Sequence, residues 1–277
     1  MYAEIVLVLE GYATPEPRLR FACRFAADLS ARLVVLYVHE LVLPPLGLLP
    51  LRYPALLAAR EARQEEAMEA AEIRSLFDTL SAAAAIEAEW REISDVTSRH
   101  IALHARYGDL LLIGARTGAE SAPEAALSIA GVIVESGRPA LVLPAVPGAE
   151  VSFRRILVGW NASREASRAV HDALPFLRRA ERVVVCNAPP AQSVFAEAPD
   201  PGLDIVAHLA RHGVHAVAEQ LPAGEDAGAA LLARAAALGA DLIVAGCYGH
   251  ARLTEFLLGG VSRTLLRDPH VPLLLSH

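Results

Sequence analysis

The chain carries the same series of segments twice, and this internal repeat limits its possible folds more than any other feature of the sequence. The matching segments are 5–12 with 156–163, 109–114 with 241–246, and 138–143 with 271–276. Because the matches keep their order, we predict two copies of one domain, a first copy at 1–146 and a second copy at 151–277. Pro147 and Gly148 mark the junction between them.

Within each copy, apolar runs alternate with stretches whose apolar residues recur at helical spacing. The predicted strands are 4–9, 33–39, 86–92, 109–114 and 139–143 in the first copy, and 155–160, 182–187, 214–220, 241–246 and 271–275 in the second. Most of these runs are apolar throughout, as is typical of parallel strands that helices cover on both faces. The pattern predicts an α/β fold with two doubly wound parallel five-stranded sheets.

The last strand of each copy is short, apolar and expected at the edge of its sheet. An edge strand has unpaired backbone groups that need a cover. We therefore expect the two last strands to pair with each other, which would make the chain an internal pseudo-dimer. The sequence leaves open whether two chains associate further as a homodimer.

The chain has no lysine, because all 25 of its Lys and Arg residues are arginines, and its formal net charge is −7. A phosphate-loop lysine and a Schiff-base lysine are therefore excluded. The acidic balance argues against nucleic acid as a partner, since nucleic-acid-binding proteins present a basic face. Three separated cysteines form no disulfide framework, and no long uninterrupted apolar run predicts a membrane span. We expect a cytoplasmic protein without membrane contact.

A glycine pattern follows the fourth predicted strand of the second copy. Gly246 and Gly249 are followed, after nine residues, by Gly259 and Gly260, and a helix is expected to begin at Val261. Glycines let the backbone approach an anion closely, and the free N–H groups at a helix N-terminus face an anion with a favourable dipole. The pattern therefore predicts a phosphate site that needs no lysine.

With this pattern the sequence resembles the universal stress protein family in its tandem two-domain form, whose nucleotide motif is G-x2-G-x9-G-[S/T]. The resemblance implies a strand order of 3-2-1-4-5 and binding of ATP or AMP, with or without Mg2+, at the C-terminal ends of the first, second and fourth strands. Carried over by position, Asn161 and Asn187 face the adenine and ribose. The motif glycines, Gly260 and the Val261 amide hold the phosphates, and Arg252 is a further candidate for phosphate contact.

Two residues of the second copy depart from the family pattern. Gly260 replaces the hydroxyl residue of the motif, so one phosphate hydrogen bond is lost unless Ser262 supplies it. Such a bond to a charged group contributes roughly 1.5–3 kcal/mol. Asn161 stands where the family commonly has an acidic residue, which removes a carboxylate from the vicinity of an anion.

The first copy departs further from the motif. Gly114 matches the first glycine, but Thr117 or Gly118 falls at the second and Leu127 at the third, although Ser128 keeps the hydroxyl position. A side chain at Leu127 would block the backbone approach that a phosphate requires. We therefore expect the first copy to bind no nucleotide in the family manner and to act as the structural partner of the second.

Other kinds of site have weaker support. The glycines could serve only turns and a helix start. His100 with His104, and His208 with His212, have the spacing of a zinc pair on a helix, but neither pair has a Glu or Cys partner in a motif, so we predict no metal site. No catalytic motif is present.

These observations leave three functions in competition. The leading interpretation is a stress-response or regulatory protein that binds ATP or AMP in its second copy and signals to an unidentified protein partner. The alternative is a ligand-free structural or interaction module of the same fold. A slow ATPase is the third, although no residue beside the glycines is marked as a general base.

Overall fold

Five strands alternate with four helices in the described part of each copy. The computed structural model describes residues 2–10, 15–39, 52–94, 97–115, 128–144, 147, 153–187, 201–222, 226–247, 260–267 and 269–277. The first copy contains β1 (Glu4–Glu10), α1 (Pro15–Leu29), β2 (Arg32–Val38), α2 (Arg52–Ala84), β3 (Ala88–Ile93), α3 (Ser98–Ala105), β4 (Leu110–Gly114), α4 (Ile129–Ser136) and β5 (Ala140–Leu143). The second contains β6 (Arg155–Trp160), α5 (Arg164–Leu177), β7 (Arg182–Asn187), α6 (Pro201–Arg211), β8 (Ala216–Gln220), α7 (Ala227–Leu238), β9 (Leu242–Gly246), α8 (Gly260–Arg267) and β10 (Leu273–Ser276).

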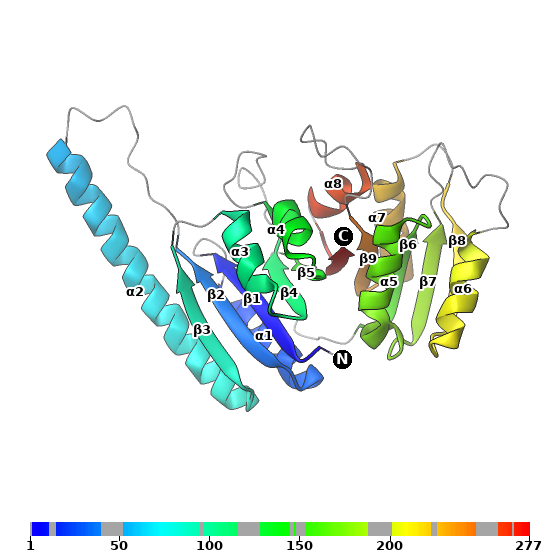
Figure 1. The fold of residues 1–277 in the computed structure, drawn as a ribbon, viewed down its shortest axis with the longest axis horizontal. Helices are drawn as coiled ribbons and strands as arrows, with labels where there is room; N and C mark the ends of the chain where they lie inside the picture. Colours follow the sequence, from blue (N-terminus) through cyan, green and yellow to red (C-terminus); the bar gives the residue numbers. More distant parts are fainter. Residues whose placement is uncertain are drawn as a thin grey trace.

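The strands form one continuous ten-stranded sheet with the order β3-β2-β1-β4-β5-β10-β9-β6-β7-β8. Each half of this sheet has the order 3-2-1-4-5 and contains only parallel pairs, as predicted. The predicted pairing of the last strands joins the two five-stranded sheets into one. Figure 1 shows the first copy, blue to green, on the left and the second copy, green to red, on the right.

The two halves join where β5 and β10 pair in antiparallel orientation. Leu273, Leu274 and Leu275 lie opposite Val142, Leu141 and Ala140. All residues of both strands are buried. The predicted pairing of the two last strands, and with it the internal pseudo-dimer, is therefore present, and neither of these strands remains an open edge.

Helices cover both faces of the sheet. Helices α1, α2, α5 and α6 contribute to the hydrophobic core on one face, and α3, α4, α7 and α8 to the core on the other. In α1 the buried residues recur at helical spacing, for example Leu19, Ala22 and Ala26. The core beneath α1 and α5 passes from one copy to the other, because Phe25 stacks on Phe176 with ring centroids 5.8 Å apart.

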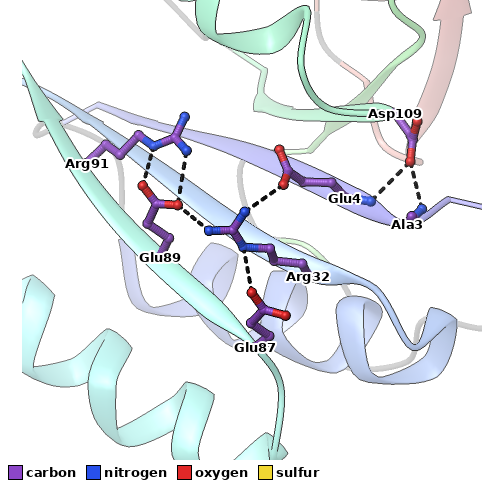
Figure 2. Close-up of polar contacts among 7 residues, drawn as sticks. All are labelled: Ala3, Glu4, Arg32, Glu87, Glu89, Arg91 and Asp109. Carbon is purple, nitrogen blue, oxygen red and sulfur yellow. Dashed lines mark hydrogen bonds and ion pairs between the residues drawn. The ribbon is translucent and has the colours of Figure 1, made fainter.

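A charge network links the first residues of β1 and β2 to the edge strand β3 (Figure 2). The Arg32 guanidinium pairs with carboxylates of Glu4 at 3.0 Å, Glu87 at 3.1 Å and Glu89. Arg91 also donates to Glu89, at 2.6 and 3.0 Å, and this hydrogen bonding lowers the pKa of the Glu89 carboxyl despite its partial burial. Alternating charges of this kind make the edge strand β3 a poor template for pairing with another chain.

Candidate functional site

The C-terminal ends of three adjacent strands form the candidate site of the second copy. Strands β7, β6 and β9 are neighbours and parallel, with Trp160 opposite Asn187 and Gly159 opposite Ala245. Asn187, at the end of β7, is only 2% exposed. In this kind of sheet, ligands bind outside the carboxyl ends of the strands. The structure thus places Asn187 and Gly246 at the edge that the sequence indicated.

Asn161 lies at the start of the turn from β6 into α5. Its side-chain oxygen accepts a hydrogen bond from the Ser163 amide at 3.1 Å, and the Ser163 hydroxyl accepts one from the Ala166 amide at 3.1 Å. Ser163 is therefore the N-cap of α5. Asn161 itself is exposed beside the strand ends.

Gly246 has a packing role that the sequence did not reveal. A Cβ atom added to this residue would lie 2.4 Å from the Ala166 nitrogen and 2.5 Å from the Glu165 carbonyl carbon, both in the backbone of α5. Only glycine lets β9 approach the first turn of α5 this closely. The presence of glycine here is therefore explained without any ligand.

Gly260, the first residue of α8, differs from Gly246 in this respect. It is exposed, and among the described residues no atom beyond its own helix backbone and chain neighbours lies within 4 Å of the position that a Cβ would occupy. Helix α8 begins here, one residue before the predicted start. In its first turn Val261 is half-buried and Ser262 is 4% exposed, on the same side of the helix as the buried Leu265. No described neighbour requires a glycine at position 260.

A buried carboxylate in the first turn of α5 lies beside these strand ends. Glu165 is 2% exposed, and its carboxylate pairs with Arg164 at 2.7 Å. Burial opposes ionisation of Glu165. The hydrogen bonds from Arg164 and from its own backbone amide, together with the charges of Arg164 and His277, outweigh burial, so the pKa of Glu165 is lowered. The nearby Cys247 thiol has its pKa raised to about 12, by burial first and then by Glu165. A carboxylate here accepts hydrogen bonds from hydroxyl or amino groups and disfavours phosphate in direct contact.

Three of the candidate residues, Gly249, Arg252 and Gly259, lie outside the described residues. In the first copy, Thr117, Gly118 and Leu127 also lie outside them. Of the corresponding first-copy residues that are described, Ser128 caps α4 by accepting a hydrogen bond from the Gly131 amide at 3.3 Å. At Gly114, a Cβ would lie 2.1 Å from the guanidinium carbon of the buried Arg18. The first copy thus places an arginine side chain against the glycine that ends β4.

The histidine pair of α6 has a third member that the sequence did not indicate. The rings of His208 and His212 lie 4.7 Å apart by their centroids, and His171 of α5 lies 5.2 and 5.7 Å from them. Among the residues that the structure describes, no group of three His, Cys, Asp or Glu side chains is arranged to hold a metal ion.

This histidine cluster predicts a loss of stability in mild acid. The pKa of His208 is lowered in the folded protein, first by burial and then by the neighbouring charges of His212, His171 and Arg211. The folded state therefore disfavours the charged form, so the free energy of unfolding decreases as the pH falls through the unfolded pKa of about 6.5. Thermal melts from pH 8 to pH 5 should show a smaller decrease in Tm for His208→Gln than for wild type. The exposed His215→Gln variant is the control, and an equal decrease in all three proteins would contradict the prediction.

Comparisons with known proteins support the resemblance. The universal stress protein family model matches residues 152–277. A universal stress protein from Archaeoglobus fulgidus DSM 4304 has a similar structure, with a TM-score of 0.69 and 18% identity over 98% of this chain and 97% of that one. A putative universal stress protein from Pseudomonas aeruginosa UCBPP-PA14 has a TM-score of 0.59 and 15% identity, over 99% and 93%. No curated protein sequence matches the chain.

The family match spans the second copy. Both structural neighbours span both copies of this chain, so the tandem arrangement has the same overall fold. In the described part of the chain, no helix has the length and apolar character needed to cross a membrane.

Proposed function

We propose that the second copy, which the universal stress protein family model matches over residues 152–277, binds ATP or AMP at the ends of β6, β7 and β9. On this proposal the chain is a cytoplasmic stress-response regulator, in which the nucleotide changes the affinity for a protein partner. The first copy completes the pseudo-dimer and binds no nucleotide.

The observation that carries this proposal is the open position at Gly260. Packing accounts for Gly246, whereas no neighbour in the described part of the chain accounts for a glycine at the first residue of α8. A ligand phosphate at the helix N-terminus would make use of both the missing side chain and the free N–H groups. Asn161, exposed, and Asn187, buried, supply amide groups at the adjacent strand ends for the base and ribose.

The ligand-free module is the competing function, and Gly246 favours it. If every glycine of the motif serves packing or turns, the motif persists in a protein that binds nothing at this edge. Calorimetric titration of the whole chain with ATP, ADP and AMP, with and without Mg2+, separates the two functions. Absence of both heat and thermal shift at millimolar nucleotide would favour the module. Single-turnover assays with Gly259→Val as the control test for slow ATP hydrolysis.

Restoring the family hydroxyl should strengthen nucleotide binding. In Gly260→Ser the new Cβ enters open space, and the hydroxyl supplies the phosphate hydrogen bond that the motif lacks. A bond to a charged group contributes roughly 1.5–3 kcal/mol, so the Kd for ATP or AMP should fall about ten- to hundredfold.

Gly260→Ala is the matched control for this variant, because it adds the same Cβ without the hydroxyl. Its affinity should equal that of wild type or be lower. Equal nucleotide affinity of the Ser and Ala variants would show that no phosphate lies at the start of α8.

A further inference from the structure

We propose that a pocket on the seam between the two copies binds a small, multiply charged oxyanion. The pocket has a volume of about 250 Å3 and takes lining residues from both copies. It is lined by Tyr2, Asp109, Arg138, Pro139, Arg168, His171, Asp172 and Pro175. The volume is below the usual range for drug-sized ligands, so the pocket suits a small ion and not a nucleotide.

Two guanidinium groups in this pocket have donors that the described protein does not use. Arg138 donates from Nε and Nη2 to the Arg106 carbonyl oxygen, at 3.2 and 2.7 Å, and makes no ion pair with the described residues. Arg168 contacts Asp172 through Nε alone, at 2.9 and 3.1 Å, so its two terminal amino groups remain available. The His171 ring adds a further nitrogen donor when it is protonated.

The acceptors of the same pocket are, in contrast, largely occupied. One oxygen of Asp109 accepts the backbone amides of Ala3 at 2.7 Å and Glu4 at 3.1 Å (Figure 2). Asp172 accepts from Arg168 on both oxygens and from the Ser276 hydroxyl at 2.9 Å on one of them. The Asp172 backbone carbonyl accepts the Tyr2 hydroxyl.

Unused donors beside occupied acceptors favour a ligand that only accepts hydrogen bonds. Phosphate and dicarboxylates have this property, and a guanidinium group matches their paired oxygens. The positive charge of Arg138 has no carboxylate partner among the described residues. Electrostatic attraction to this charge would therefore favour binding of an anion in the pocket. Neither arginine has an arginine counterpart in the other copy. Val271 of the second copy corresponds to Arg138, and Pro17 of the first copy corresponds to Arg168.

The test is a titration of the whole chain with inorganic phosphate and, in a second arm, with succinate. Isothermal calorimetry and thermal shift should both detect binding of at least one anion, and the arm that responds identifies its chemistry. Arg138→Gln and Arg168→Ala should each weaken binding about ten- to hundredfold, because each removes a charge-assisted hydrogen bond.

Arg20→Ala is the matched control. Arg20 lies on α1 and pairs with Glu16 across one helical turn, with a side-chain exposure of 49% that resembles the 50% of Arg168, but it does not line the pocket. This variant should bind as wild type. The proposal is overturned if neither anion binds, or if Arg138→Gln and Arg168→Ala bind the anion as wild type does. It is also overturned if Arg20→Ala loses as much affinity as these two variants, or if AMP displaces the anion. Melts in anion-free buffer confirm that each variant is folded.

Discussion

Gly246→Ala should destabilise the protein by about 3 kcal/mol, because its new methyl group would overlap the backbone of α5. The added Cβ lies 2.4 Å from the Ala166 nitrogen, and a backbone atom in the first turn of a packed helix cannot rotate away. Either α5 or the end of β9 must shift. A loss of this size corresponds to a decrease in Tm of roughly 6–12 °C for a chain of this length. Urea denaturation and thermal melts measure it.

Gly260→Ala is the control for this substitution within the same motif. Its Cβ has open space among the described residues, and alanine is the better helix former, so its stability should equal or exceed that of wild type. Equal stability of the two alanine variants would show that β9 and α5 are not in close contact. Because Gly246→Ala should weaken the fold itself, loss of nucleotide binding in that variant alone would not identify a ligand contact.

The architecture was predictable because local patterns determine much of it. Uniformly apolar runs such as 110–114 indicate parallel strands covered on both faces, and the repeat indicates that the architecture occurs twice. The pairing of β5 with β10, although not its antiparallel orientation, followed from one physical requirement, that two apolar edges in the same chain need a cover. Strand order came from the family resemblance, since periodicity alone does not rank the neighbours in a sheet.

The side-chain environment of the candidate site was less predictable. Spacing placed Gly246 and Asn187 at strand ends, but it gave no indication that α5 lies against Gly246 or that Glu165 is buried there. Glutamate in a first helical turn is common, so its type and position carry no signal of burial. The pocket between the two copies was also not predictable from the sequence, because Arg138 and Arg168 line the same pocket only when the two copies pack together.

The largest expected loss of stability comes from a substitution between the two copies, where aromatic rings from both copies pack in one core. Phe25 is 1% exposed and stacks on Phe21 and Phe176, with centroid distances of 5.5 and 5.8 Å. Phe153, which precedes β6, packs edge-on against Phe25 at 6.0 Å and Phe176 at 5.3 Å. Phe25→Ala should therefore cost about 3–5 kcal/mol through lost burial and the resulting cavity. Tyr107→Ala, which truncates an aromatic residue that is 82% exposed, should change stability by less than about 0.5 kcal/mol.

Because Phe25 belongs to the first copy and Phe176 to the second, this substitution also tests whether the copies unfold together. A shared core predicts that calorimetry of Phe25→Ala shows one transition at lower temperature, with both copies destabilised. Two separated transitions, with the second at the wild-type temperature, would show that the copies are independent. A double-mutant cycle with Phe176→Ala should give a coupling of about 0.5–1.5 kcal/mol for the stacked pair. A coupling near zero would mean that the rings contribute only their separate burial, and β5 with β10 would then hold the pseudo-dimer together.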